Sequence, residues 1–195
     1  MVGRHKGGAS LQAGGIRVVS LPGDSERPRR VVSASRRVEM VACYPEVLAN
    51  VLCEKCPPEE THTIVLWSKD PRNILRQGFL RRTLEMYSQL YLHFTITGMG
   101  GSFLEPWVLP QGEAFALLPE LVRFLGSAKR IRVRFDPIVH IVLPDGDCFT
   151  NLRCFEEVAR AAAAAGVPAV SVSWMAVYRK IEVRLARHGL RAGPV

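Results

Sequence analysis

The stretch FTITGMGG, residues 94–101, has the composition of a buried β-strand that ends in a glycine-rich loop. Alternating apolar and hydroxyl side chains lead into three glycines within four residues. Such glycines let backbone N–H groups approach a ligand and form an anion-binding concavity. A tight turn without a ligand is the alternative. In parallel β/α sheets, loops after the carboxyl ends of the strands form the ligand site, so similar junctions are expected beside this one.

Four further stretches share this form, a β-prone run that ends in small or charged residues. They are SASRR (33–37), WSKDP (67–71), RFDP (134–137) and SWMAVYRK (173–180). Segments with helical spacing of apolar residues separate these runs, and the connections are too long for hairpins. The alternation predicts an α/β fold with a parallel sheet of about five β/α units.

The expected elements follow from this alternation. Strands are predicted over 31–35, 61–67, 90–97, 130–135 and 169–174, and helices over 44–53, 72–88 with a break near Gly78, 113–125, 151–165 and 176–188. Between the last two strands an irregular stretch with the turn PDGD is expected. The chain of 195 residues is shorter than the roughly 250 of a complete eight-fold barrel. The sheet should therefore form a partial TIM-like barrel.

Positive charge is concentrated near the amino terminus. Residues 1–37 contain eight lysines and arginines against two carboxylates, in a chain of net charge +8. We therefore divide the chain into a basic, partly disordered arm (1–29) and a partial barrel domain (30–195), and residues 16–21 could add an edge strand. The arm is either a solvated leader or a segment that binds nucleic acid or an acidic partner. No aromatic residue interleaves with its arginines, so stacking on bases gains no support.

The cysteine count and the apolar runs indicate the compartment. Five cysteines are an odd number, and no apolar run of 7–15 residues near the start resembles a signal peptide. No run of about 18 apolar residues could span a membrane. We expect a cytoplasmic protein with reduced thiols and no membrane contact. Cys53 and Cys56 form a lone CxxC without a second pair at zinc-ribbon spacing.

The first two junctions carry cations. Arg36 and Arg37 follow the small residue Ser35 and could present guanidinium forks to a carboxylate or phosphate. Surface cations are the alternative. Lys69 lies just after a strand, where it could hold an anion or carry a proton. The alternative is that Lys69 pairs with Asp70 or with solvent.

The remaining junctions add carboxylates. In RIRVRF (130–135) the arginines alternate with apolar residues, so Arg134 belongs to a polar face. A buried guanidinium needs an ion-pair partner or a functional role. Asp136 could orient a substrate amine or pair with a neighbouring arginine, and Glu105 is the carboxylate of the glycine loop. A weaker alternative is a metal-dependent hydrolase that uses His93, Asp136 and His140.

Five motifs in order resemble a known bacterial family. SASRR, WSKDP, FTITGMGG with Glu105–Pro106, RFDPI and SWMAVYRK are similar to the series found in the family named domain of unknown function 1848, over about residues 30–181. That family resembles radical S-adenosylmethionine enzymes, with a CxxxCxxC motif near its carboxyl terminus for a [4Fe–4S] cluster. None of the five cysteines here forms this motif, so the cluster segment is expected to be absent from the chain.

The resemblance implies a function and a set of pocket residues. It implies the barrel part of a radical-S-adenosylmethionine-like iron–sulfur enzyme that acts on an unknown small-molecule substrate, with [4Fe–4S] and S-adenosylmethionine as cofactors. The alternative is a non-catalytic binding module whose basic arm engages nucleic acid or an acidic partner. An open sheet edge could also support self-association. The implied cofactor- or substrate-binding residues are Ser35, Arg36, Arg37, Lys69, Thr97, Gly98, Glu105, Arg134 and Asp136.

Overall fold

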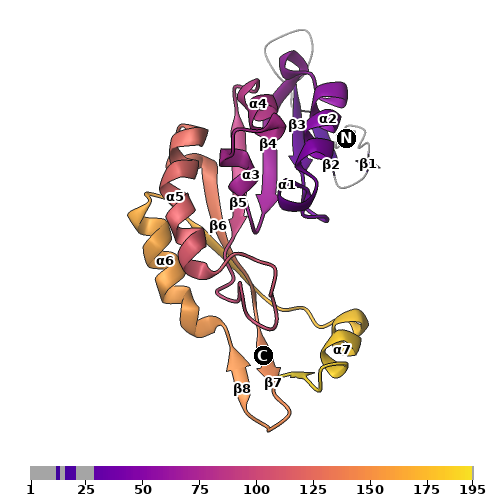
Figure 1. The fold of residues 1–195 in the computed structure, drawn as a ribbon, viewed down its shortest axis with the longest axis vertical. Helices are drawn as coiled ribbons and strands as arrows, with labels where there is room; N and C mark the ends of the chain where they lie inside the picture. The colour runs from indigo at the N-terminus through magenta and orange to yellow at the C-terminus, as the bar shows by residue number, and fades with distance from the viewer. Residues whose placement is uncertain (1–11, 14–15, 21–28, 195) are drawn as a thin grey trace, which may run out of the picture.

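Five parallel strands lie side by side in the order of the chain (Figure 1). The computed structural model describes residues 12–13, 16–20 and 29–194. The strands are β3 (Arg30–Ala34), β4 (Thr61–Ser68), β5 (Leu90–Thr95), β6 (Ile131–Ile138) and β9 (Val170–Trp174). The predicted α/β fold with about five β/α units is confirmed.

Six helices pack on one face of this sheet. They are α1 (Met40–Cys43), α2 (Pro45–Lys55), α3 (Arg72–Leu75), α4 (Phe79–Glu85), α5 (Gln111–Leu125) and α6 (Phe155–Ala164). Their buried residues share one core with Leu66, Leu92 and Val133 of the strands. Crossovers between consecutive parallel strands are right-handed as a rule, which places these helices on the same side, as in the wall of a β/α barrel.

The other face of the sheet carries buried and half-buried polar and aromatic side chains. We call it the open face and define it by Ser33, Trp67, His93, Thr95, Arg132, Arg134 and Asp136. Side chains alternate across a strand, so each of these residues adjoins a core residue in sequence. In a closed barrel this face would line the interior.

Antiparallel strands extend the sheet beyond β3. β2 (Ile16–Ser20) pairs with β3, and β1 (Gln12–Ala13) pairs with β2. The expected edge strand within 16–21 is therefore present. Most of the predicted basic arm, residues 1–11, 14–15 and 21–28, lies outside the described residues, and the domain boundary at residue 30 stays a prediction.

Helix ends follow the local sequence signals. Pro45 is the first residue of α2, and Gly78 separates α3 from α4. Gly126 ends α5 with a left-handed φ of 77°, which glycine adopts without strain. Pro119 lies inside α5. Short 3₁₀ turns, η1 (Pro58–Glu60), η2 (Ala128–Arg130) and η3 (Leu152–Cys154), precede β4, β6 and α6.

The expectation of an irregular stretch after β6 is wrong. β7 (His140–Val142) and β8 (Cys148–Thr150) form a hairpin around PDGD, and β10 (Arg191–Ala192) pairs with β7. With α7 (Arg179–Ala186) they form a small lobe beyond the carboxyl ends of the parallel strands (Figure 1). β6 continues three residues past Phe135, the predicted strand end. Within the described ranges, no helix combines the length and the apolar character needed to cross a membrane.

Candidate functional site

The ends of β4 and β5 are joined by a carboxylate. Lys69, just after β4, forms an ion pair with Glu105, and the hydroxyl of Thr97, just after β5, donates to the other oxygen of this carboxylate. The alternative pairing of Lys69 with Asp70 is wrong, because Asp70 pairs with Arg72 at 2.7 Å. The contact brings three predicted site residues together from distant parts of the chain.

The ends of β5, β6 and β9 are joined by a second ion pair. Arg134 pairs with Asp136 on the same face of β6, and its Nη1 donates to Thr95 Oγ1 at 3.3 Å. Ser173 on β9 donates to the other oxygen of Asp136. We call Lys69, Thr97, Glu105, Arg134, Asp136 and Ser173 the strand-end network. The backbone N–H of Ile96, just after β5, donates to the carbonyl of Arg134 on β6 at 2.9 Å. The two halves of the network therefore lie on neighbouring strands at one edge of the sheet.

An aromatic stack lies on the open face next to this network. The rings of Trp67 and His93 are parallel within 9°, with centroids 3.8 Å apart. The guanidinium carbons of Arg36 and Arg134 lie 5.4 and 4.9 Å from the centroid of the Trp67 ring. Trp67 Nε1 donates to Ser33 Oγ at 2.9 Å, which fixes the ring on β4. The stack therefore holds two guanidinium groups over one indole.

The electrostatics of the open face favour a neutral histidine. Burial, followed by repulsion from Arg134, Arg132 and Arg36, lowers the pKa of His93 to about 4. Burial and then the charge of Arg36 also lower the pKa of Arg134. Arginine stays protonated at neutral pH, so the positive charge of this face comes from its guanidinium groups and not from the imidazole.

A further carboxylate lies at the end of β4. Glu39 accepts hydrogen bonds from the Ser68 hydroxyl and from the backbone N–H of Lys69, both at 2.8 Å. Burial raises the pKa of the Glu39 carboxyl, although these two hydrogen bonds oppose the shift. The carboxyl lies beside Lys69 and is a group that could exchange a proton near the strand-end network.

Two of the predicted site residues at the first junction, Ser35 and Arg37, do not reach the open face. Ser35 is buried, with φ of 70°, and its hydroxyl accepts from the N–H of Met40 at 2.8 Å and donates to the carbonyl of Val38 at 3.0 Å. It thus shapes the turn before α1. Arg37 is exposed, and within the described residues it has no ion pair. Of the predicted site residues at this junction, Arg36 alone reaches the open face, where it lies over the Trp67 ring.

The glycine loop is packed tightly against its surroundings. A Cβ on Gly98, whose φ is 72°, would lie 2.6 Å from Cys154 Cβ. The N–H of Gly101 donates to the carbonyl of Glu105 at 3.0 Å, so this donor is used within the loop. At these two glycines the loop forms a tight turn, which is the alternative to the anion-binding concavity.

Asn151 is fully buried and connects the backbone segments behind the site, and it was not identified from the sequence. Its Nδ2 donates to the carbonyls of Thr97 at 2.8 Å and Pro137 at 3.0 Å, and its Oδ1 accepts from the N–H of Val139 at 2.8 Å. These bonds tie the ends of β5 and β6 together. They hold the backbone that carries the strand-end network.

The cysteines do not form a cluster site. All five lie in the described residues, and Cys56, just after α2, is buried. The others lie in separate elements: Cys43 in α1, Cys53 in α2, Cys148 in β8 and Cys154 in η3. Across the ranges the structure describes, no three His, Cys, Asp or Glu side chains gather as metal ligands. His140 stacks on Trp174, so the hydrolase alternative with His93, Asp136 and His140 gains no support. These thiols do not fit the ligand set of a [4Fe–4S] centre, which needs several thiolates at one point.

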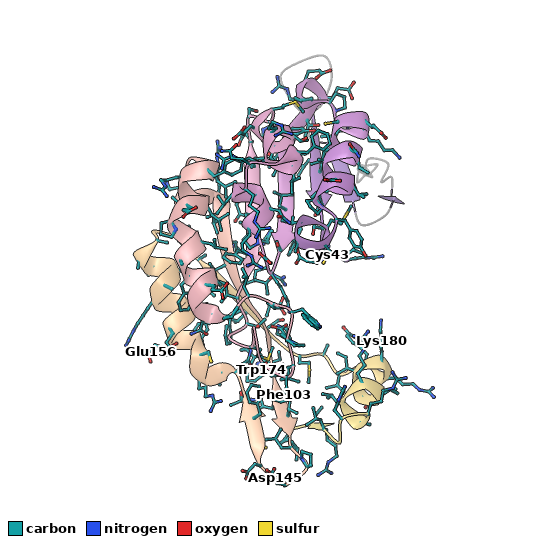
Figure 2. All side chains as sticks on the ribbon, in the orientation of Figure 1. Cys43, Phe103, Asp145, Glu156, Trp174 and Lys180 are labelled. Carbon is teal, nitrogen blue, oxygen red and sulfur yellow. The ribbon has the colours of Figure 1, made fainter. Side chains whose placement is uncertain are left out.

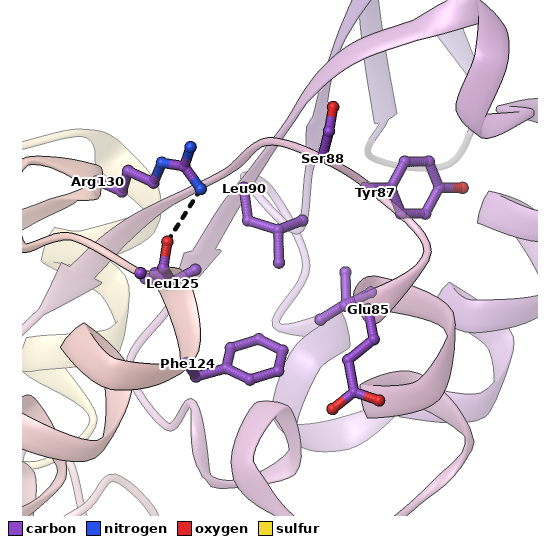
Figure 3. A pocket seen from close by; sticks show the side chains of 9 residues that line it. Glu85, Tyr87, Ser88, Leu90, Phe124, Leu125 and Arg130 are labelled. Carbon is purple, nitrogen blue, oxygen red and sulfur yellow. Dashed lines mark hydrogen bonds between the residues drawn. The ribbon is translucent and has the colours of Figure 1, made fainter.

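Two pockets of about 270 Å³ each lie away from this edge. The one in Figure 3 lies near the amino ends of β5 and β6, where Arg130 donates to the carbonyl of Leu125 at 3.0 Å. The other lies between α4 and α5, and both include Phe124. Because β/α proteins place their chemistry at the carboxyl ends of strands, these pockets are not the candidate site.

Comparison with known protein families gives a match over most of the chain. The profile of the family described as Domain of unknown function (DUF1848) matches residues 50–193, about three quarters of the chain. No curated protein matches, and no solved structure matches.

Proposed function

This chain belongs to the family described as Domain of unknown function (DUF1848), and from the geometry of its strand ends we propose that its sheet is the substrate-binding part of an enzyme related to radical S-adenosylmethionine enzymes. One observation carries the proposal. Charged and hydroxyl groups from four neighbouring strands interact across the strands at a single carboxyl edge.

The cost of these charges supports a binding role. Lys69, Glu105, Arg134 and Asp136 are all half-buried or more, and ion pairs taken out of water lose much of their solvation energy. Apolar side chains could hold the same strands together at lower cost. Charges at the carboxyl edge of a parallel sheet are instead suited to a polar ligand.

The network also limits what the substrate can be. Asp136 and Glu105 accept hydrogen bonds, Lys69 and Arg134 donate them, and Ser173 and Thr97 do both. A small molecule with several hydroxyl, amino or acidic groups could exchange hydrogen bonds with each of them. Glu39, whose carboxyl has a raised pKa, adds a proton donor or acceptor beside Lys69.

The relation to radical enzymes needs an iron–sulfur cluster, and the cysteines of this chain do not form its ligand set. The role proposed for the described residues is therefore substrate binding, and the cluster thiolates would have to be supplied from elsewhere. We derive no reaction step from these residues.

Substrate binding is tested by thermal shift with a defined panel of sugars, sugar phosphates, amino acids, nucleosides and S-adenosylmethionine. At least one class should raise the melting temperature of the wild type by several degrees. Lys69→Met with Asp136→Asn should abolish the shift, while Lys129→Met, at the opposite edge of the sheet, should keep it. An unresponsive wild type, or a shift that survives the double substitution, would contradict substrate binding at this edge.

The relation to radical enzymes is tested separately. The protein is isolated anaerobically from the cells that make it, together with any bound chain, and its iron and acid-labile sulfide are measured. Both should be present in a ratio near one. Their absence from that preparation would remove the radical-enzyme part of the proposal and leave substrate binding to the thermal-shift test.

A further inference from the structure

The open face holds more positive than negative charge. Three guanidinium groups, those of Arg36, Arg132 and Arg134, lie on it or over it. Arg134 is paired with Asp136. In the described part of the chain, no carboxylate lies within ion-pair distance of Arg36 or Arg132. With His93 neutral, the face carries two uncompensated positive charges.

Contacts on the open face position these guanidinium groups. Arg36 and Arg134 lie over the Trp67 ring, and Arg132 is the registered neighbour of His93 on the adjoining strand. An arginine that stacks by its flat face keeps its N–H edge available for a ligand. Positioning these side chains in advance reduces the entropy lost when an anion binds.

Neutral donors complete the surface. Arg132 donates to Ser171 Oγ at 3.2 Å, and Arg134 donates to Thr95 Oγ1 at 3.3 Å. Each of these hydroxyl groups accepts from an arginine and so can turn its own hydrogen towards an anion. In addition, Nδ1 of His93 is buried and has no hydrogen-bond partner among the described residues.

We propose that the open face binds the phosphate group of a small phosphate monoester, held by Arg36 and Arg132 beside the Trp67–His93 stack. A phosphate monoester carries close to two negative charges at neutral pH, which matches the two uncompensated arginines. Its three terminal oxygens accept from several directions, whereas a single carboxylate is satisfied by one guanidinium fork. The inference rests on the proposed function, because it names the substrate class of the same sheet.

The test is calorimetric titration of the purified chain with inorganic phosphate, glycerol 3-phosphate, glycerol and succinate. Both phosphates should bind, glycerol should not, and succinate should bind at least tenfold more weakly. Arg36→Gln and Arg132→Gln should each raise the Kd for phosphate about tenfold or more. Arg132→Lys keeps the charge without the fork and should give a smaller loss. Arg160→Gln, which removes an exposed arginine of α6, should leave the Kd unchanged.

Three results would overturn the inference. They are no phosphate binding, equal affinity for succinate, or equal loss in Arg160→Gln and Arg132→Gln. If phosphate fails while an unphosphorylated compound of the thermal-shift panel binds through Lys69 and Asp136, the proposed function stands and the phosphate inference falls. If neither experiment detects binding, both fall.

Discussion

Trp67 and His93 occupy registered positions on β4 and β5, and their rings stack with centroids 3.8 Å apart. The stack lies on the face that the helices leave uncovered, next to Arg36 and Arg134. An aromatic pair among arginines gives the sheet a rigid surface where a barrel would have its interior.

The neutral state of His93 gives stability a pH dependence. Its pKa is about 4 in the folded protein, against 6.5 for a free histidine, so between these pH values only the unfolded chain binds the proton. Stability should therefore fall as the pH drops from 6.5 to 4, by at most about 1.4 kcal/mol per pH unit from this residue. Urea unfolding at a series of pH values measures the slope.

His93→Gln removes this titration and should flatten the slope relative to wild type. His188→Gln changes an exposed histidine after α7 and should reproduce the wild-type slope. If His93→Gln and wild type lose stability in parallel over this range, the histidine is not held neutral by its surroundings.

Glycine at position 100 is required by the loop after β5. A Cβ there would lie 1.8 Å from the carbonyl oxygen of Leu109, which is backbone and cannot turn away. Gly100→Ala should destabilise the protein by about 1–3 kcal/mol. Gly112→Ala is the matched control, because nothing lies within 4 Å of its Cβ and alanine favours helix α5, so stability should rise by up to about 1 kcal/mol. Equal effects of the two changes in chemical denaturation would show that the loop is not packed as described.

Asn151 should be essential to the carboxyl edge. Asn151→Asp replaces the donating amide with a carboxyl, so the carbonyls of Thr97 and Pro137 lose their partner in a buried place. The cost should be about 2–5 kcal/mol in the free energy of unfolding. Asn50→Asp makes the same chemical change on the exposed side of α2 and should stay within about 0.5 kcal/mol. A tolerated Asn151→Asp would mean that another contact holds β5 to β6.

The edge of β9 should promote self-association. β9 is the last strand of the described sheet, and its residues Val172 and Trp174 are 52% and 47% exposed. Figure 2 labels Trp174, the last residue of β9. Because unpaired strand edges pair with other edges, the protein should form oligomers as its concentration rises, and Val172→Lys should suppress them.

Light scattering measures this association. Val183→Lys alters a similarly exposed valine on α7 and should leave the oligomers in place. A wild-type protein that stays a monodisperse monomer over the same concentrations would contradict the prediction.

The parallel sheet could be predicted because its signals are local. Apolar spacing marks each helix, and Pro45, Gly78 and Gly126 lie where helices begin, break or end. The small sheet could not be predicted in this way. β7 and β8 have three residues each, and β10 has two and pairs with β7 almost fifty residues away, so no periodicity marks them.

The site was predictable only in part. The alternation in RIRVRF correctly places Arg132 and Arg134 on one face. No prediction places Trp67 and His93 on that face, and their stacking depends on the register between β4 and β5. Likewise, the partner of Lys69 is 36 residues away, at a distance set by the tertiary fold and not by sequence spacing.

The central claim is that the open face, beside the Trp67–His93 stack, is where a ligand binds. Nuclear magnetic resonance of the three indole N–H groups during a titration with glycerol 3-phosphate tests it directly. The Trp67 signal, whose N–H donates to Ser33, should shift progressively and reach saturation, while the signals of Trp107 and Trp174 stay in place. A Trp67 signal that does not move at saturating ligand, or that moves no more than the other two, would contradict the account.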